Sequence, residues 1–233
     1  MRVRRFGWFT AAIAVSAAAM SVGAATAKPP PTGGKSSATI AAKPNPVVYG
    51  SSASISGVVK GKHASGATVT LQSKPYPYTA PYSKAGTTTA TAAGRYSFRV
   101  SPSLNTAYQV VANTAPQATS PKLIVKVRVR IRLQVSTTKP AAGQRVRFSG
   151  FVLPAYNGKS VLIQRFSATG WKTVTSATLV ASTPVKTVFG MTPRSMYSKR
   201  LRVLKNGTYR VYFKPHDGRL IANTSPLRKL TVH

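Results

Sequence analysis

The chain has 233 residues, with 34 lysines and arginines against a single acidic side chain, Asp217, so its formal net charge is +33. Because it contains no cysteine and no glutamate, the sequence excludes disulfides, thiolate metal sites, paired-carboxylate catalysis and carboxylate calcium cages. Apolar residues make up 42% of the sequence, which is enough for packed cores, and the cations must therefore face water, mobile anions or a polyanionic partner.

Residues 1–27 have the pattern of a secretory signal peptide. Three arginines precede an alanine-rich apolar run over residues 9–20, and a small-x-small cleavage site ends at Ala27. The apolar run is shorter than the roughly 20 residues that a membrane-spanning helix needs. We therefore expect a secreted, extracellular protein with no transmembrane segment in the mature chain, which its charge could hold at the cell surface.

After a flexible linker over residues 28–36, rich in proline and glycine, the chain repeats itself. Four blocks recur in the same order: 50–59 with 143–152, 66–72 with 158–164, 96–110 with 197–211, and 119–121 with 224–226. Such ordered self-similarity indicates a duplicated structural unit. We therefore predict a first domain over residues 37–127 and a second over residues 128–233.

Each copy reads as seven short strands separated by turn residues. In the first copy the expected strands are 37–49, 52–59, 67–73, 86–92, 95–101, 107–113 and 121–127. In the second they are 128–138, 144–152, 159–166, 172–190, 197–203, 208–214 and 226–232, where 172–190 is a longer, hairpin-like region. This size and pattern favour an antiparallel sandwich.

At the boundary between the copies, ten residues from Lys126 to Val135 alternate strictly between apolar side chains and cationic or polar ones. Successive side chains of a strand point to opposite faces, so this stretch predicts a half-buried strand with a cationic outer row. The boundary contains no glycine, proline or serine around Val127, and we expect limited bending there.

The repeated blocks resemble bacterial secreted proteins with tandem immunoglobulin-like domains, of the immunoglobulin-like or fibronectin III-like β-sandwich kind. The resemblance rests on the block over 143–152, on the Val-x-Leu-Gln and Val-x-Ile-Gln strands, and on Asn-x-x-Tyr-x-Val in both copies. It implies an all-β fold of two tandem antiparallel sandwiches, used as spacers, adhesion modules or envelope-binding domains. It also implies that Tyr108 and Tyr209 are tyrosine corners, with the ring packed and the hydroxyl bonded to backbone.

The two copies differ in charge, with eleven lysines and arginines over residues 28–127 and twenty over residues 128–233. In the second copy the arginines follow the strand alternation, and strands A, B and E of such a sandwich share one sheet. The arginines predicted on the outer face of this sheet are Arg128, Arg130, Arg132, Arg145, Arg147, Arg200 and Arg202. Arginine gives bidentate contacts to phosphate, so this face predicts binding to an anionic envelope polymer or to extracellular nucleic acid. The alternative is a structural spacer in which charge serves only to keep a monomeric protein soluble.

Aromatic residues suggest a further alternative, a carbohydrate-binding adhesion module. Tyr76, Tyr78 and Tyr82 are spaced by prolines in a stiffened loop, and Trp171 follows a glycine, so their rings could stack on sugars. The same tyrosines could instead cover the edge of the sandwich, and Trp171 could be a strand anchor.

The sequence predicts a non-enzymatic protein without cofactor or metal. His216 and Asp217 are adjacent in a turn, but no nucleophile accompanies them.

Overall fold

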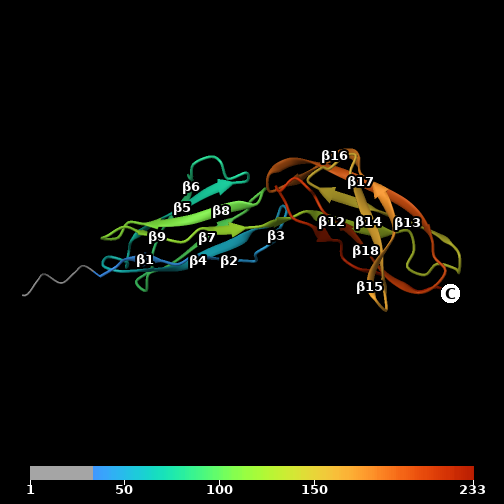
Figure 1. The fold of residues 1–233 in the computed structure, drawn as a ribbon, viewed down its shortest axis with the longest axis horizontal. Coiled ribbons are helices and arrows are strands. Elements are labelled where there is room, and N and C mark those ends of the chain that lie inside the picture. The colour runs from blue at the N-terminus through green and yellow to red at the C-terminus, as the bar shows by residue number, and fades with distance from the viewer. Residues whose placement is uncertain (1–33) are drawn as a thin grey trace, which may run out of the picture. The chain divides into compact units, whose positions relative to one another are not determined.

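The computed structural model describes residues 34–233, which form strands and turns and contain no helix (Figure 1). The predicted signal peptide, and all but the last three residues of the predicted linker, lie outside the described residues. No helix within residues 34–233 could cross a membrane. The prediction of an all-β fold built from antiparallel sheets is confirmed.

Two antiparallel sheets account for most strands of the first half of the chain. The strands are β1 (Ser37–Ala38), β2 (Ala41–Lys43), β3 (Val47–Val48), β4 (Ala53–Lys60), β5 (Thr68–Pro75), β6 (Ser83–Thr89), β7 (Arg95–Val100), β8 (Thr106–Ala112), β9 (Ala118–Thr119) and β10 (Leu123–Val125). In one sheet β4 pairs with β1, β2 and β7, and the other sheet runs β10-β8-β5-β6, with β9 also on β8.

The second half repeats this arrangement. Its strands are β11 (Val127–Arg128), β12 (Arg130–Val135), β13 (Arg145–Leu153), β14 (Ser160–Ser167), β15 (Gly170–Thr178), β16 (Val180–Thr187), β17 (Gly190–Arg202), β18 (Gly207–Phe213), β19 (Asn223–Thr224) and β20 (Arg228–Leu230). One sheet runs β12-β13-β17-β16, and the other runs β15-β14-β18-β19, with β20 also on β18. The central pairs β4–β7 and β5–β8 thus correspond to β13–β17 and β14–β18.

The same tyrosine–glycine contact occurs in both halves. Tyr96 pairs across the strands with Gly57, and Tyr197 pairs in the same way with Gly150. The Tyr197 hydroxyl passes over its glycine and donates a 2.6 Å hydrogen bond to the carbonyl oxygen of Arg132 on the next strand. The Tyr96 hydroxyl makes the equivalent bond to the carbonyl oxygen of Thr39. A side chain at either glycine would collide with this contact, which explains why both blocks contain glycine.

These contacts involve tyrosines other than the predicted tyrosine corners, Tyr108 and Tyr209. The rings of Tyr108 and Tyr209 are buried. Tyr96 and Tyr197 each lie beside a glycine and bond a backbone carbonyl through the hydroxyl.

A second shared feature is a buried serine in the repeated Thr-Ser-Pro blocks. The Ser120 hydroxyl accepts a hydrogen bond from the Val110 amide at 2.9 Å, and the Ser225 hydroxyl accepts one from the Val211 amide at 2.9 Å. Each hydroxyl donates to the carbonyl of the following proline. The duplication therefore extends from the sequence to individual hydrogen bonds.

Several expected strands are interrupted in the structure. The expected strand 37–49 is divided into β1, β2 and β3. Prolines 44 and 46 separate β2 from β3, since proline cannot donate to a ladder, and residues 39–40 separate β1 from β2. The expected strand 172–190 is two strands in different sheets, and the buried Leu179 lies at the crossover between them. β17 begins at Gly190, seven residues before the expected start at 197, so it is much longer than predicted.

At the boundary between the copies, the predicted alternation is confirmed by burial. Val127, Val129, Ile131 and Leu133 are at most 5% exposed, whereas the side chains of Lys126, Arg128, Arg132 and Gln134 are exposed and that of Arg130 is half-buried. The strand itself is broken at Val129 into β11 and β12.

Backbone hydrogen bonds from both halves meet at this boundary. β11 pairs in parallel with β3, and the amide of Val47 donates to the carbonyl of Lys126 at 2.9 Å. The loop between β18 and β19 reaches the same place, where the Ile221 amide donates to the Val127 carbonyl at 2.8 Å and the Val129 amide donates to the Ile221 carbonyl at 3.2 Å. Residues Gly33–His233 form one compact unit.

Candidate functional site

The outer face of the β12-β13-β17-β16 sheet carries most of the predicted arginines. Along β13, Val146, Phe148 and Val152 point to the core and are fully buried, so the alternate residues Arg145 and Arg147 point outward. We call this outward surface the arginine face.

Four arginines form a block at one end of the arginine face. Arg145 lies directly opposite Arg202, and Arg147 lies directly opposite Arg200. All four side chains are exposed. Side chains opposite each other on neighbouring strands have Cβ atoms about 5 Å apart, and like charges at this spacing destabilise the sheet. We call these four residues the arginine block. It is a compact cationic surface, and the only carboxylate of the sequence lies elsewhere, in the loop after β18.

A second cationic group lies farther along the same face. Arg132 is exposed and lies opposite Phe151, and the guanidinium of Arg194 lies 5.5 Å from the centre of the Phe151 ring. Sequence reasoning missed Arg194 because the strand was expected to begin at residue 197. Arg194, Arg200 and Arg202 are separated by even numbers of residues, and alternate residues of a strand share a face. This spacing could have identified Arg194 as part of the face.

Between the two cationic groups the face is polar and hollowed. The residues that line a recess of about 370 Å³ there are Gln134, Arg147, Ser149, Val180, Met196, Tyr197 and Ser198. The face therefore offers cations on both sides of a recess that can accept the neutral part of a ligand.

Two predicted members of the face belong to the boundary between the halves instead. Arg128 lies in β11, which pairs with β3 and not with β13. Arg130 faces outward opposite Leu153, but it is half-buried and its Nη2 atom lies 3.2 Å from the hydroxyl oxygen of Ser51. The positions of both arginines follow from contacts of the first half with β11 and β12, and the sequence pattern does not reveal these contacts.

The predicted glycan-binding aromatics do not form one surface. Tyr76 and Tyr78 contact each other edge to face at 5.6 Å, and the hydroxyl of Tyr76 lies against Gly218 of the second half. The Lys74 ammonium lies over the ring of the half-buried Tyr82 at 5.4 Å. These contacts favour the covering role that the sequence left open for the tyrosines.

Trp171 lies on the other sheet, in β15. Its ring contacts Phe166 at 5.3 Å, and the Arg210 guanidinium stacks on it at 4.1 Å. Phe166 is 55% exposed, so this group is a partly open aromatic surface.

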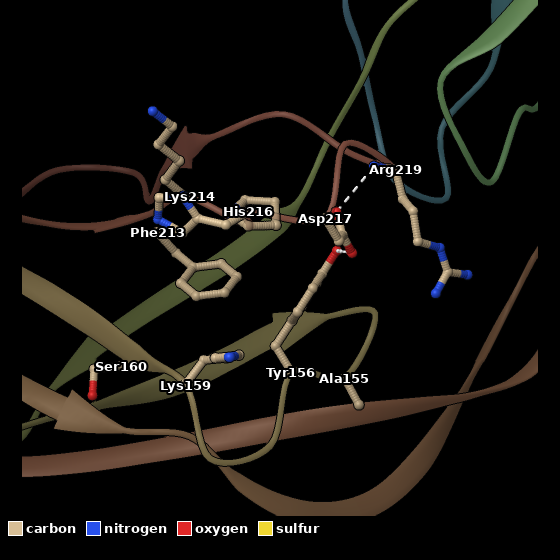
Figure 2. Close-up of a pocket in the computed structure, with 10 residues that line it drawn as sticks. Ala155, Tyr156, Lys159, Ser160, Phe213, Lys214, His216, Asp217 and Arg219 are labelled. Carbon is tan, nitrogen blue, oxygen red and sulfur yellow. Dashed lines mark hydrogen bonds between the residues drawn. The ribbon is translucent and has the colours of Figure 1, made fainter. Parts of the chain in front are cut away.

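A pocket of about 580 Å³ is lined by residues from the β13–β14 connection and the start of β14, 155–160, and by residues from the end of β18 and the loop after it, 213–219 (Figure 2). Two hydrogen bonds in the pocket reach the carboxylate of Asp217. The Tyr156 hydroxyl donates to Oδ2 at 3.1 Å, and the backbone amide of Arg219 donates to Oδ1 at 3.0 Å. Burial raises the pKa of Tyr156, and the neighbouring Asp217 carboxylate raises it further.

In Figure 2 the side chains of Tyr156, Lys159 and Phe213 point toward a common space, and that of Lys214 extends away from it. Sequence reasoning considered His216 and Asp217 only as catalytic residues and did not anticipate the pocket. Tyr156 and Asp217 are 61 positions apart, and no spacing pattern links them.

Within residues 34–233, no group of three or more histidine or carboxylate side chains could hold a metal ion. No protein-family model matches the chain, and a sequence comparison with curated proteins finds no match.

Proposed function

We propose that this chain is a secreted, non-enzymatic protein of two tandem immunoglobulin-like β-sandwich domains, residues 37–127 and 128–233, that binds an anionic polymer through the arginine face. An envelope polymer is the favoured partner, because the expected export separates the protein from the genome. The same charges would hold the protein at the cell surface.

The arginine block is the observation that carries this proposal. Two arginines on β13 lie directly opposite two on β17, so like charges meet twice on one surface. Such pairs cost stability, and a bound polyanion would remove that cost by neutralising them. Arginine suits this task because its planar guanidinium binds phosphate oxygens in pairs.

The remaining part of the face fits a polymer better than a single ion. Arg132 lies opposite Phe151, which is four residues along β13 from Arg147, and Arg194 lies six residues along β17 from Arg200. At about 3.4 Å per residue, the two cationic groups are roughly 14–20 Å apart. A chain of repeating anionic units could contact both groups at once.

The test measures binding of residues 28–233, which contain the whole compact unit, to purified poly(glycerol phosphate) and to duplex DNA as the salt concentration rises. Arg145, Arg147, Arg200 and Arg202 are replaced together by glutamine. Each phosphate contact contributes roughly 0.9 to the logarithmic salt slope on duplex DNA, so we expect the slope to fall by roughly 3 to 4 with DNA, and by less with the less densely charged poly(glycerol phosphate).

The matched control removes four exposed lysines from the first half, Lys60, Lys62, Lys84 and Lys122, again by glutamine. It carries the same net charge as the first variant, and we expect it to keep most of the wild-type slope. Equal weakening in the two variants would contradict the proposal and support the spacer alternative. Binding confined to DNA would replace the envelope polymer with nucleic acid.

The group around Trp171 favours a second candidate, binding of a neutral glycan by an adhesion module. Phe166, Trp171 and Arg210 are in contact and partly open, as a sugar-stacking surface requires. Loss of binding to a neutral polysaccharide on Trp171→Ala, with the arginine block intact, would support this candidate. Unchanged binding on this substitution would remove it.

A further inference from the structure

The pocket beside Asp217 has the size and construction of a small-molecule site. Its volume of about 580 Å³ falls within the range of roughly 300–1,000 Å³ that is usual for ligand pockets. It is separate from the arginine face, since its walls are the loops that follow β13 and β18.

The wall formed by the loop after β13 is fixed by hydrogen bonds to neighbouring residues. The amide of Tyr156 donates to the hydroxyl of Ser195 at 2.7 Å, and this fully buried serine donates to the side-chain oxygen of Asn157 at 2.6 Å. Lys159 accepts a hydrogen bond from the Leu179 amide at 2.7 Å, and the amide of Gly158 donates back to Leu179. The backbone positions of Tyr156 and Lys159 are therefore fixed.

The wall that follows β18 is held by the first half. The side-chain amide of Asn105 donates to the carbonyl of Gly218 at 2.9 Å, and the backbone amide of Asn105 donates to the carbonyl of Arg219 at 2.8 Å. The Phe213 ring packs against the Tyr156 ring at 5.1 Å, so the two walls also contact each other at the base of the pocket. A ligand would not have to order either wall, which favours binding.

The chemistry of the pocket is mixed. One hydrogen bond reaches each oxygen of Asp217, and each oxygen keeps acceptor capacity. A carboxylate repels a bare anion but accepts hydrogen bonds from hydroxyl groups. The Lys159 and Arg219 side chains on the same walls favour a negative group, and Tyr156 and Phe213 offer apolar ring surface.

We infer that this pocket binds a monosaccharide-sized ring that carries one anionic group, a carboxylate or a phosphate. The ring hydroxyls donate to Asp217, the anionic group meets Lys159, and the ring packs against Tyr156 and Phe213. A neutral sugar has no group for Lys159, and a bare phosphate has no hydroxyl array for Asp217. This site is independent of the arginine face.

The test uses calorimetric titration of residues 28–233 with four probes at about 150 mM salt, where exposed charges are screened beyond about 8 Å. The probes are glucuronic acid, glucose 6-phosphate, glucose and inorganic phosphate. We expect at least one of the two anionic sugars to bind about tenfold or more tightly than glucose and inorganic phosphate, as one hydrogen bond to a charged group predicts. The tighter of the two identifies the anionic group as carboxylate or phosphate.

Two substitutions separate the roles of the charges. Lys159→Gln, at an exposed position, should weaken the anionic sugars about tenfold and leave glucose unchanged. Asp217→Asn should weaken the anionic sugars and leave or strengthen the binding of inorganic phosphate. Lys122→Gln, which removes a charge outside the pocket, should change nothing.

The inference is overturned if neither anionic sugar binds, or if phosphate binds as tightly as glucose 6-phosphate and Asp217→Asn strengthens both. The second result would describe a simple anion site. A thermal melt of each variant shows whether it folds, and Lys159→Gln still decides the inference if Asp217→Asn does not fold. The glutamine variant of the arginine block should keep this binding, so failure of the pocket and failure of the polymer site are distinguishable.

Discussion

The two halves of the chain share their central strand pairs and two specific hydrogen-bond motifs, but they differ in what their outer faces carry. The positions of Arg145, Arg147 and Arg202 in the second half correspond to Ser52, Ser54 and Ser101 in the first, and only Arg200 has an arginine counterpart. That counterpart, Arg99, lies opposite Ser54 rather than opposite a cation. The first half folds with the same pairing and without the block, so the block is not needed for the fold.

The pocket is likewise a feature of the second half that is added to the framework shared by both halves. The loop that follows β18 runs to Ile221 before it pairs with β11, whereas the corresponding loop of the first half is already back on β8 at Ala118. The longer loop brings Asp217 to Tyr156 and also contacts the first half. The duplicated framework therefore tolerates both new charge and new loop length.

The largest effects are expected where the halves are the same. Gly57→Ala and Gly150→Ala should each lower the free energy of unfolding by about 3 kcal/mol, because the added methyl group would overlap a carbonyl oxygen and the tyrosine hydroxyl above it. Urea denaturation measures this change. Gly34→Ala is the control, since nothing lies within 4 Å of the position. A loss below about 0.5 kcal/mol at either glycine would show that the shared contact does not hold the sheets.

The next effect should follow the difference between the halves. Replacing Arg145, Arg147 and Arg202 by serine makes the second face resemble the first, and the logarithmic salt slope of polyanion binding should fall by roughly 2 to 3. The reverse substitutions, Ser52→Arg, Ser54→Arg and Ser101→Arg, should restore the slope in the doubly altered chain. If the transplanted arginines do not restore it, the recess and the second cationic group of the original face are also required.

Alkaline pH tests the shared tyrosine contacts. Burial raises the pKa of Tyr96 to about 12 from an ordinary value of 10.0, and it also raises the pKa of Tyr197. Both groups are neutral donors when protonated, so their contribution to stability is complete below pH 10 and falls as the pH rises above 10. For Tyr96 it is lost by about pH 12. Tyr96→Phe and Tyr197→Phe should each flatten the fall of the urea midpoint above pH 10. Tyr82→Phe, in a connecting loop, should keep the wild-type profile.

The smallest effect should come from the like-charged pairs. Arg147→Ser should raise the melting temperature at low salt by about 2–4 °C, which corresponds to a gain of about 1 kcal/mol in a chain of this size. Sulfate should raise the melting temperature of the wild type more than that of this variant. Arg99→Ser in the first half is the matched control and should change little, because Arg99 faces Ser54. Equal sulfate effects in all three proteins would mean that the block carries no local repulsion.

Much of the fold could be predicted because it depends on local periodicity. The alternation from Lys126 to Val135 correctly predicts which side chains are buried, since a half-buried strand has one face in the core and one in solvent. The repeat correctly aligns Gly57 with Gly150 and Tyr96 with Tyr197, although the hydrogen bond was expected at other tyrosines. The strand breaks were missed, because pairing partners distant in sequence determine where a ladder ends.

The candidate site could be predicted in part for the same reason. Arg145, Arg147, Arg200 and Arg202 share one face because their strands alternate, and this is visible in the sequence. The position of Arg130 depends on Ser51 of the other half, and the pocket depends on Tyr156 meeting Asp217. Contacts of this kind follow from loop paths, for which the sequence has no periodic signal.

The boundary between the halves has a consequence for the resistance of the protein to proteolysis. Lys126, Arg128, Arg130 and Arg132 make it a dense run of cleavage sites for trypsin-like proteases in an extended chain. Such enzymes cut exposed, unpaired loops. Here the backbone of β11 is paired with β3, and Val127 and Val129 bond Ile221 from the other side. The side chains that attract the protease are exposed, while the peptide bonds that it would cut are held in the sheet, so the folded chain should resist digestion at this basic segment.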